Sequence, residues 1–165
     1  VESLAHNYAD FCGLDVRLVR YAAIAGPWRG RGGGGPSNVF RDMVETAIKT
    51  RETTISPQAV EWVYSKDAAR GTVLALKANS PKGRVFNVGT GSNNSILDIA
   101  NFIINASGLP LKPIHGPELP GDVRGTKADI TLIQNKLGWK PKIFLEDWLT
   151  KTVRNMNLSA KHFDI

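Results

Sequence analysis

The sequence predicts an α/β fold in which helices cover a sheet. Short apolar runs rich in β-branched residues, such as residues 14–25 and 83–89, alternate with segments whose apolar residues recur at helical spacing, such as residues 96–104. Alternation of strands with helices is typical of a layered α/β domain. With 165 residues, of which 42% are hydrophobic and 22% charged, the chain has the composition of one globular domain.

Two elements are expected before residue 26. Residues 1–12 form a helix ended by Gly13, with one apolar face made of Leu4, Ala5, Tyr8, Phe11 and Cys12. Residues 14–25, "LDVRLVRYAAIA", are apolar enough for a buried strand, and ligands of α/β proteins bind where such strands end. Because no capping residue precedes Val1, we expect the chain to be the tail of a longer protein.

The remaining elements are read in order from spacing, caps and turn residues. They are a helix capped by Ser37 or Asn38, strands at 53–56 and 61–64, a helix capped by Ser65 over 66–78, a strand at 83–89, a helix at 96–104 ended near Gly108, and helices over 128–138 and 145–156.

The glycine tract at residues 26–38, "GPWRGRGGGGPSN", contains the spacing G-x-G-x-x-G. A dinucleotide-binding turn needs its glycines tight between strand and helix, and an acidic residue at the end of the next strand. Here Pro27 and Pro36 lengthen the connection, and Glu52 precedes the next strand instead of ending it. We interpret the tract as a loop over a cleft, which leaves a substrate lid or an RNA-binding Arg-Gly segment as alternatives.

Charge and cysteine content favour a soluble protein with anionic partners. The 21 Lys and Arg residues exceed the 15 Asp and Glu residues, which gives a formal charge of +6. Cys12 is the only cysteine, so no internal disulfide can form, and we expect a reducing, cytoplasmic setting. No apolar run approaches the roughly 18 residues that span a bilayer, so no membrane contact is expected.

Three later stretches carry a family resemblance: "VEWVYSKDAARGTVLAL" (60–76), "RVFNVGTGSNNSILDIANFI" (84–103) and "PGDVRGTKADITLIQNKLGWKPKIFLEDWL" (120–149). In this order they resemble the C-terminal half of the NAD-dependent epimerase/dehydratases, which are extended short-chain dehydrogenase/reductases. "LDVRLVRYAAIAGP" is similar to the family's "LDVVxLRxxNVYGP". The resemblance covers about 2–156 and implies the C-terminal part of a Rossmann-like, NAD(P)-binding fold with a small substrate-binding subdomain.

The resemblance also implies a division of the chain. Residues 1–25 would be the last helix and strand of the Rossmann domain, and residues 26–165 mainly the substrate-binding part, with one or two returning Rossmann elements. The resulting open strand edge and the apolar face of 1–12 predict a homo-oligomer.

Family catalysis needs a tyrosine and, four residues later, a lysine that lowers the pKa of that tyrosine. The tyrosine takes the hydroxyl proton of the substrate while the nicotinamide takes the hydride. None of the three tyrosines here has that lysine, because the positions hold Cys12, Ala25 and Ala68. We therefore assign no catalytic residue, and interpret the chain as a substrate-binding fragment of an NAD-dependent sugar epimerase or dehydratase. We expect NAD or NADP in the intact enzyme and no tight binding by this chain alone. The alternative is a stand-alone basic module that binds nucleic acid or another polyanion.

The resemblance assigns cofactor contacts to Tyr21, Ala22 and Ala23, where small residues allow the backbone to approach the nicotinamide. The other interpretation is that these residues simply end a buried strand. Asp67 matches an acidic position at a helix start, and we interpret it as structural.

Substrate contacts are expected from Trp28, Arg29, Arg31 and Arg124, with a surface ion pair as the alternative role for Arg124. Ala23 replaces a family asparagine, and Val60 and Leu119 replace arginines that hold a pyrophosphate, so a nucleotide sugar and a smaller anionic sugar acid both stay open. The three histidines have no second ligand at metal-binding spacing, so no metal site is assigned.

Overall fold

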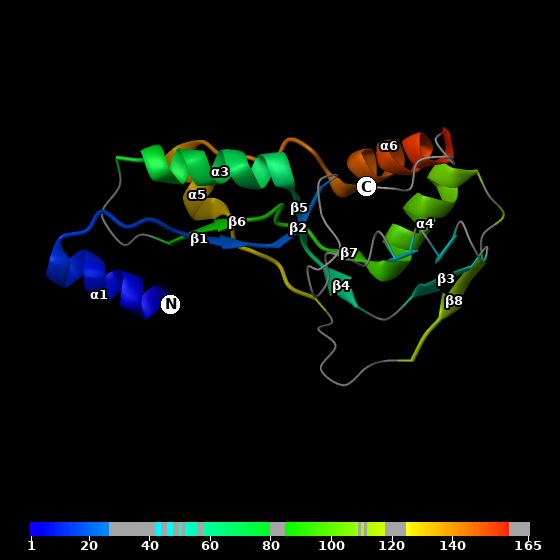
Figure 1. Ribbon diagram of the computed structural model, residues 1–165, viewed down its shortest axis with the longest axis horizontal. Helices are drawn as coiled ribbons and strands as arrows, with labels where there is room; N and C mark the ends of the chain where they lie inside the picture. Colours follow the sequence, from blue (N-terminus) through cyan, green and yellow to red (C-terminus); the bar gives the residue numbers. More distant parts are fainter. Residues whose placement is uncertain are drawn as a thin grey trace.

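The computed structural model describes residues 1–26, 42–43, 46–47, 50, 52–55, 58–79, 85–108, 110, 112–117 and 125–158. Within these residues the predicted α/β class is confirmed (Figure 1). The elements are α1 (Glu2–Cys12), β1 (Leu18–Tyr21), β2 (Ala23–Ala25), β3 (Glu52–Ile55), β4 (Ala59–Val60), β5 (Trp62–Tyr64), α3 (Ser65–Lys77), β6 (Val85–Val88), β7 (Asn94–Ser95), α4 (Ile96–Ser107), β8 (Lys112–His115), α5 (Thr131–Leu137) and α6 (Leu145–Leu158).

The strand predicted over 14–25 begins later and is divided in two. β1 pairs with β6 in parallel, and β2 pairs in parallel with β5. The change of partner occurs at Ala22, whose N–H bonds to the carbonyl of Val88 at 3.0 Å, while the N–H of Ala23 bonds to the carbonyl of Glu61 at 3.1 Å. One stretch of chain therefore joins two strand pairs.

Three smaller features complete the strand arrangement. β3 pairs with β8 in parallel, and β4 pairs with β7 in antiparallel fashion. β5, α3 and β6 follow one another, so α3 is the crossover between two parallel strands, as such strands require. In Figure 1, α3 and α5 lie on one side of the β1–β6 pair and α1 lies on the other.

Apolar side chains form two separate cores that meet at β5. The sheet core lies between β1, β5 and β6 and the helices α3 and α5, and comprises Val63, Ala68, Ala75, Phe86, Val88, Ile130, Ile133 and Trp139. The helical core is built around α4 and α6, and comprises Ala25, Met43, Ala47, Ile55, Trp62, Ile96, Ile99, Ala100, Ile103, Leu145, Leu149 and Val153. Neighbouring residues of a strand point to opposite faces, so Trp62 enters one core and Val63 the other.

Three helices end at glycines, as predicted, whereas the predicted start of α3 is wrong. Gly13, Gly108 and Gly138 adopt left-handed conformations with φ of 67°, 63° and 61°, as helix stops do. The predicted cap at Ser65 is wrong, because Tyr64 is the N-cap of α3 and no side chain caps that end. β5 runs into α3 without a linker, and a side chain at Gly26 would meet the Ser65 Oγ at 2.3 Å. Ser65 is therefore packed against Gly26 within the first turn.

The helix predicted at 1–12 is confirmed as α1, and its apolar face is open. Leu4, Tyr8 and Phe11 are exposed, while Ala9 is buried. Among the helices that the structure describes, none combines the length and apolar character needed to cross a bilayer.

Candidate functional site

The candidate site lies at the carboxyl ends of β1 and β6, where parallel α/β sheets bind their ligands. Three segments meet there: residues 21–23, residues 89–93 and residues 125–130. The Nδ2 of Asn87 donates to the carbonyl of Asp129 at 2.9 Å, which ties the end of β6 to the third segment. Because a side chain on Gly125 would come within 3.1 Å of Asn93 Nδ2, the second and third segments lie against each other.

The three residues assigned to the cofactor lie at the change of strand partner. The Tyr21 hydroxyl is 2.6 Å from Thr72 Oγ1, so this side chain reaches α3. Ala22 and Ala23 are half-buried, and the N–H of each already has a backbone partner. Any backbone contact that these two residues make with a ligand must therefore use a group other than the N–H.

The four residues assigned to substrate, Trp28, Arg29, Arg31 and Arg124, lie outside the described residues. The described part of the chain does supply one cation close to Arg124 in sequence. Lys127 is exposed in the segment that leads from Gly125 to α5. It is available to an anionic ligand at this edge.

Glu61 is a residue of this site that sequence reasoning missed. Its side chain is buried, with 2% of its surface exposed. The carboxylate accepts hydrogen bonds from the N–H of Gly91 at 2.7 Å and from the N–H of Ala128. The backbone carbonyl of Glu61 accepts the N–H of Ala23. The available signal was a single charge inside the apolar run "VEWVY", because a buried carboxylate must find donors.

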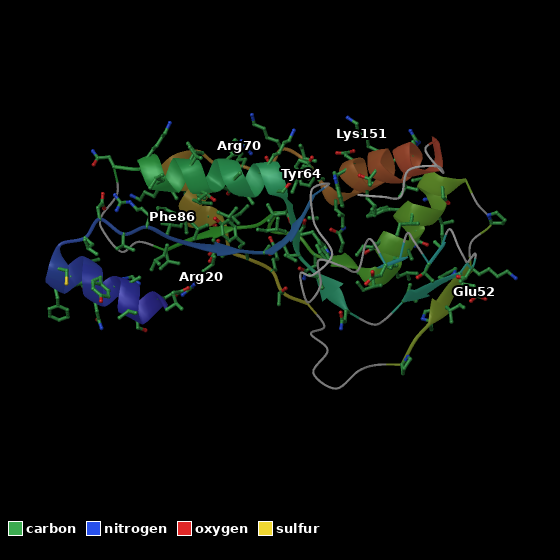
Figure 2. All side chains as sticks on the ribbon, in the orientation of Figure 1. Arg20, Glu52, Tyr64, Arg70, Phe86 and Lys151 are labelled. Atoms are coloured by element: carbon green, nitrogen blue, oxygen red, sulfur yellow. The ribbon has the colours of Figure 1, made fainter. Side chains whose placement is uncertain are left out.

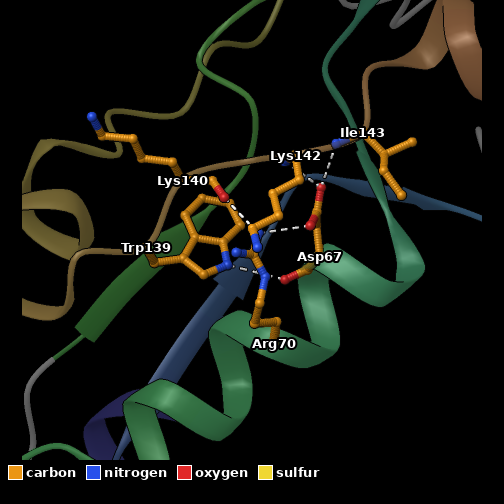
Figure 3. Close-up of polar contacts among 6 residues, drawn as sticks. All are labelled: Asp67, Arg70, Trp139, Lys140, Lys142 and Ile143. Atoms are coloured by element: carbon orange, nitrogen blue, oxygen red, sulfur yellow. Dashed lines mark hydrogen bonds and ion pairs between the residues drawn. The ribbon is translucent and has the colours of Figure 1, made fainter.

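Asp67 is the other buried charged side chain among the described residues, and it supports the predicted structural role (Figure 3). Its carboxylate accepts from the N–H of Lys142 at 2.7 Å and of Ile143 at 2.9 Å, and pairs with Arg70 at 2.7 Å. The indole N–H of Trp139 donates to its carbonyl at 3.1 Å. Asp67 thus fastens the connection between α5 and α6 to the start of α3.

The amino end of α1 is linked to β1 by an exposed ion pair. Arg20 Nε lies 2.7 Å from Glu2 Oε1, and Figure 2 shows Arg20 between β1 and α1. The hydrogen bond from Arg20 lowers the pKa of Glu2 below its ordinary value of 4.5. This contact links the first turn of α1 to β1.

A small apolar pocket lies at the ends of β2 and β5, beside α6. Its lining includes Ala25, Tyr64, Phe144 and Trp148, and the Tyr64 and Trp148 rings are tilted with centroids 6.1 Å apart. Its lining contains no charged side chain. Within the described ranges, no three His, Cys, Asp or Glu residues gather as a metal site would require.

Comparisons with known proteins give one consistent result. The family model described as "NAD dependent epimerase/dehydratase family" matches residues 1–89. A UDP-glucuronate 4-epimerase of Thermodesulfobacterium geofontis is 32% identical over 160 residues, covering 92% of this chain and 46% of that protein. A UDP-glucose 4-epimerase of Mycolicibacterium smegmatis is 28% identical over 155 residues, covering 92% of this chain and 49% of that protein.

Solved structures agree with these relatives. A UDP-glucose 4-epimerase of Thermotoga maritima, solved with UDP-glucose, superposes with a TM-score of 0.83 at 29% identity, over 97% of this chain and 52% of that one. A UDP-glucuronic acid 4-epimerase of Bacillus cereus, in complex with UDP-glucuronic acid and NAD, gives 0.79 at 26% identity, over 94% and 50%. This chain spans about half the length of the proteins that it matches.

Proposed function

This chain belongs to the NAD-dependent epimerase/dehydratase family of nucleotide-sugar enzymes, and from that membership we propose that it forms the substrate-side part of such an enzyme. The intact enzyme would oxidise a carbinol carbon of a sugar nucleotide or sugar acid. The nicotinamide of NAD or NADP, when bound, would accept the hydride. This chain would bind and orient the sugar. It would not itself take the hydroxyl proton, because it lacks the Y-x-x-x-K pair.

One observation supports the proposal most directly. The backbone at Ala23, the residue assigned to the nicotinamide side, is bonded to Glu61, whose carboxylate holds Gly91 and Ala128. Segments that are far apart in the sequence thus converge where α/β enzymes bind their ligands. Small residues such as Ala22 and Ala23 allow a flat ring to approach the backbone closely.

Within this proposal the residues have distinct roles. Tyr21, Ala22 and Ala23 border the nicotinamide end of the cofactor, and we assign no residue of this chain to its phosphates. Trp28, Arg29, Arg31 and Arg124 hold the anionic part of the substrate. Residues 1–25 belong to the cofactor-binding half, and one or two later elements, such as α3 and β6, return to it from the substrate-binding part.

A nucleotide sugar is the substrate class that the relatives favour, since their names refer to UDP-glucose and UDP-glucuronate. A smaller sugar acid is the second candidate, and one feature of the sequence favours it. Ala23, Val60 and Leu119 stand where the family carries ligand-binding polar residues. An aliphatic side chain cannot replace an arginine that binds phosphate with two hydrogen bonds.

Calorimetry on this chain tests the proposal with four probes: UDP-glucuronate, UDP-glucose, free glucuronate and NAD. We expect binding of at least one sugar probe and none of NAD in the low micromolar range, which would correspond to about 8 kcal/mol. Tight NAD binding by the chain alone would contradict the substrate-side assignment. Binding of none of the sugars would contradict the function itself.

A duplex DNA probe serves as the control for charge. A chain of formal charge +6 can bind DNA at low salt through counterion release, and such binding falls steeply as salt is added. We expect it to vanish at physiological salt. Tight DNA binding that persists at physiological salt and prefers one sequence would instead support the polyanion-binding alternative. The relatives named above give that alternative no support.

A further inference from the structure

Glu61 stands out because its buried charge is satisfied in an unusual way. Among the described residues only Glu61 and Asp67 are buried and charged, and only Asp67 has a described cation within ion-pairing distance. Within the described part of the chain, the hydrogen bonds of the Glu61 carboxylate come from the backbone N–H groups of Gly91 and of Ala128. Hydrogen bonds to a charged acceptor are stronger than neutral ones, so both N–H groups are held firmly.

The two donors belong to segments that lie far from Glu61 in the sequence. Gly91 is 30 residues from Glu61 in the sequence and follows β6, while Ala128 is 67 residues away and precedes α5. The backbone of Glu61 adds a third attachment, because its carbonyl accepts the N–H of Ala23. One residue therefore bonds to three segments at the strand ends, in addition to the contacts of Asn87 with Asp129 and of Asn93 with Gly125.

The neighbouring glycine shows that space has been kept for this carboxylate. A Cβ atom at Gly89 would lie 2.2 Å from Glu61 Oε1 and 3.1 Å from the Cβ of Ala128. The φ angle of Gly89 is not in the left-handed region, so space and not backbone conformation requires a glycine here. The end of β6 is thus shaped around the Glu61 side chain.

We propose that Glu61 is a positioning residue, which fixes the segments 89–93 and 125–128 against Ala23 so that the sugar-binding edge is ordered before the ligand arrives. This inference rests on the proposed function. Its substance is that Glu61 acts on ligand affinity through the two segments and does not touch the ligand. Preorganised segments raise affinity because less conformational freedom is lost on binding.

The test combines hydrogen exchange with UDP-glucuronate binding in four variants of this chain. Glu61→Gln keeps the side-chain length but faces two N–H donors with one oxygen and one NH₂ group. Glu61→Asp keeps both oxygens and the charge. Glu52→Gln changes an exposed glutamate of β3, and Trp139→Phe weakens the sheet core away from Glu61.

We expect amide exchange at Gly91 or Ala128 to accelerate at least tenfold in Glu61→Gln, and affinity for UDP-glucuronate to fall about tenfold at a temperature where the variant is fully folded. Glu61→Asp should restore part of both, whereas Glu52→Gln should change neither. Trp139→Phe should lower the melting temperature while keeping the affinity, which separates positioning from a general loss of stability.

Two results would overturn the inference while leaving the proposed function intact. One is exchange at both amides that is unchanged in Glu61→Gln. The other is an affinity that falls equally in Glu61→Gln and Trp139→Phe, which would make the role of Glu61 merely structural. Failure of the unaltered chain to bind UDP-glucuronate, UDP-glucose or glucuronate would overturn both the inference and the function.

Discussion

The surroundings of Asp67 and Glu61 show two ways in which one fold buries a carboxylate. Asp67 pairs with Arg70 and accepts two consecutive N–H groups, so all its contacts bind one connection to one helix (Figure 3). Glu61 accepts N–H groups from two distant segments that flank the candidate site. The first arrangement is suited to stability, and the second to holding a ligand-binding edge in place.

The largest effect is expected from Asp67→Ala. The change leaves the N–H groups of Lys142 and Ile143 without their acceptor and removes the ion-pair partner of Arg70, which keeps its hydrogen bond to the carbonyl of Lys140. Each N–H group left without an acceptor costs about 1–3 kcal/mol, so we expect a total loss of about 3–5 kcal/mol of unfolding free energy. Urea denaturation measures the loss. Asp10→Ala on exposed α1 is the control and should unfold like the original chain. If Asp67→Ala lost as little unfolding free energy as the control, Asp67 would not be a stabilising contact, and its contrast with Glu61 would be wrong.

Gly89→Ala should cost somewhat less, about 2–3 kcal/mol, because the new methyl group forces the Glu61 carboxylate away from its two N–H partners. The amide signals of Gly91 and Ala128 should shift in NMR spectra, while the indole signal of Trp139 stays in place. In the control Gly125→Ala, the only described atom that the methyl group meets is Asn93 Nδ2, the end of an exposed side chain that can move. If the two substitutions lowered the unfolding free energy and shifted the amide signals equally, the contact between Gly89 and the Glu61 carboxylate would have no particular importance.

Trp139→Phe tests the Asp67 side of the comparison alone. The variant loses the indole hydrogen bond to the Asp67 carbonyl, and its smaller ring weakens the contact with the Arg70 guanidinium, whose centre lies 5.9 Å from the Trp139 ring. We expect a loss of about 1–2 kcal/mol in thermal or urea unfolding. Amide exchange at Gly91 should stay unchanged. Acceleration there would mean that the two carboxylates act as one network.

The smallest effect on stability is expected at the exposed pair of Glu2 and Arg20, which provides the contrast with burial. The pKa of Glu2 is lowered in the folded state, so the pair stabilises the fold above pH 4.5, and its contribution is lost as the pH falls below that value. Arg20→Gln should return the pKa of Glu2 toward 4.5 in an NMR titration, with little change in unfolding. A pKa that stays low in the variant would contradict the role of Arg20.

Much of the element order could be predicted, because it depends on local periodicity and stop residues. Gly13 and Gly108 end helices as expected, and Ile96, Ile99 and Ile103 line a buried helix face. The family, too, was correctly identified from three ordered motifs. The division between β1 and β2 was missed because it depends on which strand lies alongside, and β8 was missed because its four residues are all exposed and give no alternation.

The candidate site was less predictable than the fold. Tyr21, Ala22 and Ala23 were assigned to the cofactor by resemblance; they lie where β1 ends and β2 begins, and their role stays a prediction. Glu61 was overlooked because its partners are far away in sequence, and no local pattern reveals a tertiary hydrogen bond. The roles of Arg124 and of the glycine tract beyond Gly26 stay predictions, since those residues lie outside the described ranges.

The alternation of Trp62 and Val63 has a consequence for exchanging parts between related enzymes. Since these neighbours fill different cores, β5 is a wall shared by both, and a slip of one residue in its register would exchange their places. In a hybrid of two related sequences, a junction placed directly before or after β5 therefore leaves one of the two cores with residues from both parents. A hybrid enzyme that takes its substrate-binding part from one relative must therefore inherit β5 together with the partners of both faces, or be repacked on the face that it leaves behind.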